Sequence, residues 1–184
     1  MLSDLQNLSG WKLNAAEMSD RHHAYLSLGS NIQPETNLVK AIDLLQDYGM
    51  LAKVSNAWES HSVGAEGPNY LNACVLMTTP LSQIALKEQA LLPIETELGR
   101  RRGANRFAPR TIDIDVVIFD GAGCDDKYWG QAFVVVPLAE IYPNYQNPLR
   151  PETILETATR LRQRIWLETR PSVLQRFHGL DPAA

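Results

Sequence analysis

The residue pair with the clearest chemical meaning is Asp113 and Asp115, which interrupt the apolar run from Ile112 to Val116. Side chains alternate along a strand, so we expect both carboxylates on one face, with α-carbons roughly 6.5–7 Å apart. Two like charges side by side destabilise a strand unless cations lie between them. Carboxylates at this spacing suit Mg²⁺, which completes its shell with water and substrate phosphates. The pair therefore indicates either a magnesium site or a solvated strand face.

Arginines are concentrated directly before this strand. Five of the 17 basic residues lie within 11 positions, namely Arg100, Arg101, Arg102, Arg106 and Arg110. Guanidinium groups bind phosphate through paired hydrogen bonds and stay charged. Beside the two aspartates, the cluster favours a clamp for nucleotide phosphates, while a solvated patch or a nucleic-acid surface stays open as an alternative. The sequence has neither a Gly-rich Walker loop nor a dinucleotide-binding fingerprint.

An aromatic residue and an amide form a third candidate group. Tyr70 and Asn72 have the same parity in an apolar run that ends at Thr79, so they lie on one face of the predicted strand. This combination can stack on a flat heterocycle and hydrogen-bond its edge. The alternative is a half-buried sheet residue beside a turn amide.

Composition limits the partners of these groups. The chain has 184 residues, 45% of them hydrophobic and 21% charged, with a formal charge of −4, which is typical of one globular domain without general affinity for polyanions. We therefore expect small-molecule substrates and no nucleic acid. Cys74 and Cys124 are too few for a disulfide framework and indicate a reducing, cytoplasmic setting. No apolar run approaches 18 residues, so no membrane association is expected.

Six elements are needed to position the candidate residues. Hydrophobic periodicity and turn residues predict strand, helix, strand, strand, helix and strand at 24–28, 34–48, 51–60, 70–79, 82–98 and 111–119. Pro93 predicts a kink or break in the second helix. This order predicts an α+β fold, a ferredoxin-like βαββαβ sandwich with helices on one face.

The later part of the chain predicts additions to this fold. After an irregular loop over 120–132, we expect an added short strand at 133–136, a helical turn at 137–141 and a C-terminal helix over 151–167. Residues 1–22 are interpreted as an N-terminal extension, 23–170 as one domain and 171–184 as a tail.

Several motifs in order resemble the 6-hydroxymethyl-7,8-dihydropterin pyrophosphokinase family. The most specific is Gly99-Arg100-x-Arg102 followed by the run from Arg106 to Asp115. The supporting matches are 24–31, 69–73, 94–95 and 133–141. The resemblance covers residues 24–143 and implies an enzyme that transfers diphosphate from ATP to the hydroxymethyl group of a dihydropterin in folate synthesis, releasing AMP.

The resemblance also implies roles for particular residues. Asp113 and Asp115 would hold two Mg²⁺ ions, and Arg100 and Arg110 would neutralise the transferring phosphates. The nucleotide would contact Glu95, Arg102, Val116 and Lys127. The dihydropterin would bind to Ser60, Val63, Gly64, Tyr70, Asn72 and Phe133, with its ring between Tyr70 and Phe133. ATP would be the co-substrate.

The segment 120–132 departs from the family pattern. It lacks the family's Pro-His pair and following Arg, and Gln131 stands near the expected Arg position. His61 lies where the family has a Pro-containing stretch. Two alternatives stay open: the same chemistry on a modified pterin, as in methanopterin-type pathways, or a degenerate relative that binds pterin or nucleotide without activity. An RNA-binding module on a similar fold is a further alternative, which the acidic net charge disfavours.

Overall fold

The computed structural model describes residues 21–62, 67–101 and 108–179. Its strands are β1 (His22–Ser30), β2 (Met50–Val54), β3 (Ala57–Ser60), β4 (Tyr70–Thr79), β5 (Asp113–Phe119), β6 (Ala122–Gly123) and β7 (Leu167–Arg170). The helices are α1 (Pro34–Leu45), α2 (Gln83–Ala85), α3 (Leu92–Glu97), α4 (Ala132–Ile141), α5 (Ile154–Arg162) and α6 (Pro171–Leu174). A π-helical stretch η1 (Leu86–Leu91) joins α2 to α3, and η2 (Asp126–Gly130) and η3 (Gln175–Phe177) are 3₁₀ turns.

All seven strands belong to one antiparallel sheet with the order β6-β5-β1-β4-β3-β7, and β2 pairs with β4 beside β3. The predicted α+β, ferredoxin-like arrangement is confirmed by β1, α1, β4, the α2–α3 helix and β5. The strand expected over 51–60 is two strands, β2 and β3. They separate at Ser55, whose hydroxyl accepts a hydrogen bond from the Cys74 amide at 2.9 Å.

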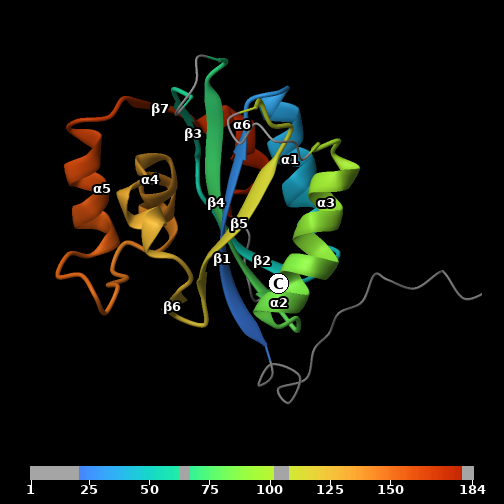
Figure 1. The fold of residues 1–184 in the computed structure, drawn as a ribbon, viewed down its shortest axis with the longest axis horizontal. Coiled ribbons are helices and arrows are strands. Elements are labelled where there is room, and N and C mark those ends of the chain that lie inside the picture. Colours follow the sequence, from blue (N-terminus) through green and yellow to red (C-terminus); the bar gives the residue numbers. More distant parts are fainter. Residues whose placement is uncertain (1–20, 63–66, 102–107, 180–184) are drawn as a thin grey trace, which may run out of the picture.

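Helices cover both faces of the sheet rather than one (Figure 1). The α1 helix and the α2–α3 helix pack on a core that contains Leu26, Leu28 and Ile114. The α4 and α5 helices cover the opposite face, where Cys74 and Val117 are buried. Because the second face is also apolar over half its length, it too must be covered. In the described part of the chain, no helix combines the length and the apolar character needed to cross a membrane.

The strand predicted at 133–136 is wrong, because these residues lie in α4. Valines at 134, 135 and 136 favour a strand by propensity, which tertiary packing overrides. All three valines and Leu138 are buried, because α4 lies between the sheet and α5 and is covered on both sides. Pro137 is accommodated inside this helix.

The helix predicted over 82–98 extends through Pro93 without a break. Ser82 caps it by accepting a hydrogen bond from the Ala85 amide at 3.3 Å. The π-helical turn η1 precedes the proline, with Leu92 donating to the Lys87 carbonyl. Because proline has no N–H to donate and its ring crowds the preceding turn, the helix continues through Pro93 by way of a widened turn.

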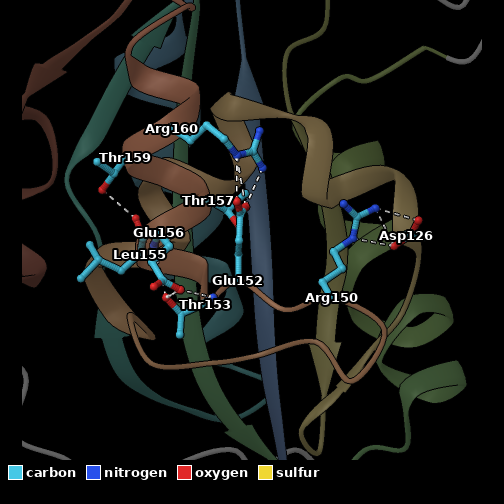
Figure 2. A network of polar contacts seen from close by, with 9 residues as sticks. All are labelled: Asp126, Arg150, Glu152, Thr153, Leu155, Glu156, Thr157, Thr159 and Arg160. Atoms are coloured by element: carbon cyan, nitrogen blue, oxygen red, sulfur yellow. Dashed lines mark hydrogen bonds and ion pairs between the residues drawn. The ribbon is translucent and has the colours of Figure 1, made fainter.

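The C-terminal helix is shorter than predicted, and α5 is followed by β7. Thr153 and Glu156 form a capping box that fixes the start of α5, and Glu152 pairs with Arg160 at 2.8 Å (Figure 2). Arg150 reaches back to Asp126 of η2 at 2.8 Å (Figure 2). This ion pair connects the segment before α5 to the loop that borders the site described below.

The expected tail begins with structure that packs on the core. Leu174 of α6 is fully buried, and Phe177 of η3 is 5% exposed. Both belong to the apolar cluster that also contains Leu38 of α1 and Ala57 of β3. Residues 171–177 therefore contribute to the hydrophobic core although they follow the predicted domain boundary.

Replacing Leu174 by Ala is expected to lower the free energy of unfolding by about 2–5 kcal/mol, because it leaves a cavity in a closed core. Urea denaturation followed by circular dichroism measures this change. Leu149, which is 85% exposed, offers the same substitution as a control and should change stability by less than about 0.5 kcal/mol. Equal effects of the two variants would show that α6 does not stabilise the domain.

Candidate active site

The sheet face beneath α4 changes character along its length. Near one end, Tyr25 of β1, Leu76 of β4 and Val117 of β5 are buried under α4. Toward the other end, the same strands carry polar side chains that α4 leaves open. A cavity of about 290 Å³ lies there, lined by Ser27, Gly29, Ser60, His61, Ser62, Tyr70, Asn72, Arg110, Asp113, Asp115, Tyr128, Gln131, Phe133 and Val134.

Asp113 and Asp115 lie on the same face of β5, as their spacing predicts. Asp113 is opposite Gly29 of β1, and Asp115 is opposite Ser27. A Cβ atom at Gly29 would lie 3.2 Å from the Asn72 side-chain oxygen, so glycine keeps the floor of the cavity open between the carboxylates and the amide. Ile114 points into the core on the other face.

Two arginines hold the Asp113 carboxylate, one on each oxygen. Arg100 bonds one oxygen and also bonds the buried carboxylate of Glu95, while Arg110 bonds the other oxygen. Glu95 in turn accepts a hydrogen bond from the Ile114 amide at 2.9 Å. The cluster therefore fastens the end of α3 to the start of β5 and brings both predicted phosphate-binding arginines to the carboxylates.

Asp115 has a different environment. Burial, and then the charge of Asp113, raise the pKa of Asp115. The positive charge of Lys127 and a hydrogen bond from the Tyr128 hydroxyl lower the pKa of Asp115. Burial also raises the pKa of Tyr128, so its hydroxyl stays protonated and can donate to Asp115.

The group expected to bind a heterocycle lines the same cavity. Tyr70 and Asn72 enter from β4, Phe133 from the first turn of α4, and Ser60 from the end of β3. The Asn72 amide nitrogen donates to the Ser60 hydroxyl at 3.0 Å and to the Trp58 carbonyl at 3.3 Å. These two bonds fix the orientation of the amide, so its oxygen faces Gly29.

Other predicted residues lie outside this cavity. The Val116 side chain points into the opposite core, and Glu95 is buried behind Arg100. Lys127 is exposed on η2, where it pairs with Asp125 at 2.9 Å and lies over the Tyr128 ring. Arg102, Val63 and Gly64 fall outside the residues that the structure describes.

Some cavity residues did not emerge from sequence patterns. Ser27 shares the parity of Tyr25 on β1, so strand alternation alone could have identified it. Tyr128 and Gln131 belong to an irregular segment without periodicity, and only the three-dimensional arrangement brings them to the carboxylates.

The carboxylates of this cavity meet part of the ligand requirement of a divalent cation. Among residues 21–62, 67–101 and 108–179, no group of three or more His, Cys, Asp or Glu side chains forms a complete cage. Two neighbouring carboxylates nevertheless provide hard oxygen ligands, and burial together with the charge of Asp113 raises the pKa of Asp115. These residues therefore fit Mg²⁺ that completes its shell with water and ligand phosphates.

Comparisons with known proteins identify the family of the chain. A family model described as 7,8-dihydro-6-hydroxymethylpterin-pyrophosphokinase (HPPK) matches residues 25–143. The 2-amino-4-hydroxy-6-hydroxymethyldihydropteridine pyrophosphokinase of Synechocystis sp. is 34% identical over 73% of this chain and 74% of its own length. The protein of the same name from Methylorubrum extorquens is 34% identical over 75% of this chain and 92% of its own length.

The fold is similar to that of solved structures as well. A Plasmodium falciparum HPPK-DHPS triple mutant with pteroate superposes with a TM-score of 0.63 at 12% identity, covering 88% of this chain and 45% of that one. The wild-type protein with pteroate gives a TM-score of 0.58 at 11% identity over 78% of this chain and 43% of that one. At these identities the likeness concerns the fold alone.

Proposed function

The chain belongs to the 7,8-dihydro-6-hydroxymethylpterin-pyrophosphokinase family, and from this premise we propose that it transfers the β,γ-diphosphate of ATP to the hydroxymethyl group of 6-hydroxymethyl-7,8-dihydropterin, a step of folate synthesis that releases AMP. One observation supports this activity above the others. A single cavity presents the Asp113–Asp115 pair beside Tyr70, Asn72 and Phe133. It thus combines groups for a metal-bound triphosphate with groups for a flat heterocycle.

The dihydropterin occupies the end of the cavity formed by β3, β4 and α4. Tyr70 and Phe133 provide aromatic faces for its ring, and Asn72 provides a hydrogen bond to its edge. Ser60 positions the Asn72 side chain, because their 3.0 Å hydrogen bond holds the amide in one orientation. The substrate hydroxymethyl group is then directed toward the carboxylates of β5, where the triphosphate must lie.

The carboxylates and arginines form the phosphate end. Asp113 and Asp115 would hold two Mg²⁺ ions, which when bound neutralise phosphate charge and polarise the phosphorus that the hydroxyl attacks. A bound triphosphate would compete with Asp113 for Arg100 and Arg110, and the Asp113 carboxylate released from them would be available to hold a cation. The arginines then stabilise negative charge on the transferring group and on the departing AMP.

The loop 120–132 supplies groups that differ from the family pattern. Tyr128 donates to Asp115 and holds this carboxylate in place. Lys127 lies near enough for its charge to act on both aspartates, so we assign it to the nucleotide side.

We place the reaction in the cytoplasm, where both cysteines, which are free thiols, remain reduced.

The activity is tested by incubating the protein with Mg²⁺, ATP and hydroxyalkyl pterins and separating the nucleotides by ion-exchange chromatography. We expect AMP to form in equal amount with pterin diphosphate when 6-hydroxymethyl-7,8-dihydropterin is present, and not when pterin is omitted. AMP with a modified pterin alone would reassign the substrate. No AMP with any pterin at high enzyme concentration would contradict the proposed activity.

A further inference from the structure

His61 lies at the rim of the cavity and has partners that the proposed reaction does not yet use. It follows directly after β3 and lines the cavity next to Ser60. Its ring stacks on Trp166, with centroids 4.5 Å apart and planes inclined by 22°. The stack fixes the plane of an imidazole that borders the proposed pterin site.

A chain of hydrogen bonds assigns the protonation of this imidazole. Glu59 accepts a hydrogen bond from the Asn69 amide nitrogen at 2.7 Å, because a carboxylate can only accept. The Asn69 oxygen is therefore the atom that lies 3.1 Å from Nδ1 of His61. An amide oxygen can only accept as well, so Nδ1 carries the proton. In the neutral ring, Nε2 is consequently an acceptor.

Two residues that support the orientation of the His61 ring, Trp166 and Arg170, come from the C-terminal part of the chain. β7 pairs with β3, which places Leu167 opposite Ser60 and Glu168 opposite Glu59. Arg170 of β7 forms ion pairs with both Glu59 and Glu168. Trp166 directly precedes β7. Both Trp166 and Arg170 lie beyond residues 25–143, which the family model matches.

We propose that His61 is a specificity-determining residue that accepts, through Nε2, a hydrogen bond from an N–H donor at the edge of the bound dihydropterin. The inference rests on the proposed function. A dihydropterin presents such donors at N3, at N8 and at its 2-amino group. Trp166 and Asn69 are positioning residues, because they hold the His61 ring in its plane and in its tautomer.

The test replaces His61 by Phe, which keeps a ring on Trp166 but removes Nε2. Isothermal titration calorimetry would measure the dissociation constant of 6-hydroxymethyl-7,8-dihydropterin with Mg²⁺ and α,β-methylene-ATP present. We expect binding to weaken roughly tenfold, the value of one hydrogen bond. The 3-methyl, 8-methyl and 2-deamino analogues each lack one of the three N–H donors. For the analogue that lacks the donor to His61, wild type and His61→Phe should bind with equal affinity.

His23→Phe, on an exposed part of β1, is the matched control and should bind the dihydropterin as wild type does. The affinity for α,β-methylene-ATP and the melting temperature should be unchanged in His61→Phe, whereas a purely structural role would alter them. The inference would be overturned if His61→Phe bound the dihydropterin as tightly as wild type does, or if the variant lost the same affinity for all three analogues. In either case, AMP release by wild type would still support the proposed reaction. No dihydropterin binding by wild type would overturn both.

Discussion

Replacement of Asp115 by Asn is expected to reduce AMP formation about a thousandfold or more, because several kcal/mol of metal-dependent stabilisation of the transferring phosphates is lost. The variant keeps the size of the side chain, and Asp115 lies on the polar, open side of β5. The fold should therefore persist, with an unchanged circular dichroism spectrum. Initial rates at saturating ATP and dihydropterin measure the effect.

The control for this variant is Asp47→Asn, which changes the same functional group at an exposed position after α1. It should leave the rate unchanged. Retention of more than a tenth of the wild-type rate by Asp115→Asn would show that this carboxylate does not hold the metal.

The pH dependence of metal binding provides a second readout of the same variant. Burial and Asp113 raise the pKa of Asp115, so this carboxyl becomes protonated at a higher pH than an ordinary aspartate. Protons then compete with Mg²⁺, and the affinity for Mg²⁺ should fall as the pH is lowered. In Asp115→Asn, this contribution to the pH dependence should be absent.

Arg110→Ala is expected to lower kcat by about 10²–10³-fold, the usual cost of removing one preorganised group that stabilises transition-state charge. Arg110 lines the cavity, and a third of its side chain is exposed, so the loss should fall on the reaction rather than on stability. Steady-state kinetics and thermal denaturation of the same preparation separate the two effects.

Arg100→Ala should behave differently from Arg110→Ala. The Arg100 side chain is 13% exposed and compensates both Glu95 and Asp113. Its removal breaks a largely buried ion pair with Glu95, which is expected to cost about 3–5 kcal/mol of stability in addition to activity. Arg164→Ala, at an exposed position after α5, is the control and should change neither quantity. Equal stability of the Arg100 and Arg110 variants would contradict these assigned roles.

The parts of the fold that follow from periodicity could be predicted, and the parts decided by packing could not. Strand alternation identified β4 with its observed ends and placed Asp113 and Asp115 on one face of β5. The valines before Pro137 have strand propensity, but the open apolar face of the sheet buries them better as a helix. Long-range pairing places β7 beside β3 and Trp166 against His61, and no local pattern indicates this pairing.

In the candidate site, too, some residues could be predicted from the sequence and others only from the packed structure. Residue chemistry selected the aspartates, Tyr70, Asn72 and a cluster of arginines, within which the family resemblance singled out Arg100 and Arg110. These six residues gather at or beside one cavity. Strand parity also predicts that the Val116 side chain faces the opposite core, as observed, whereas the family resemblance assigned Val116 to the nucleotide side. The hydrogen bond from Tyr128 to Asp115 becomes evident only once η2 is placed over this carboxylate.

The central claim, that one cavity transfers an intact diphosphate from ATP to a pterin, is tested most directly by following the individual phosphates. ATP labelled with ³²P at the α or the β position would be incubated with Mg²⁺, enzyme and 6-hydroxymethyl-7,8-dihydropterin, and the products separated by chromatography. We predict that the α label appears only in AMP and the β label only in the pterin product. A β label recovered in ADP would mean transfer of a single phosphoryl group and would contradict the proposed reaction.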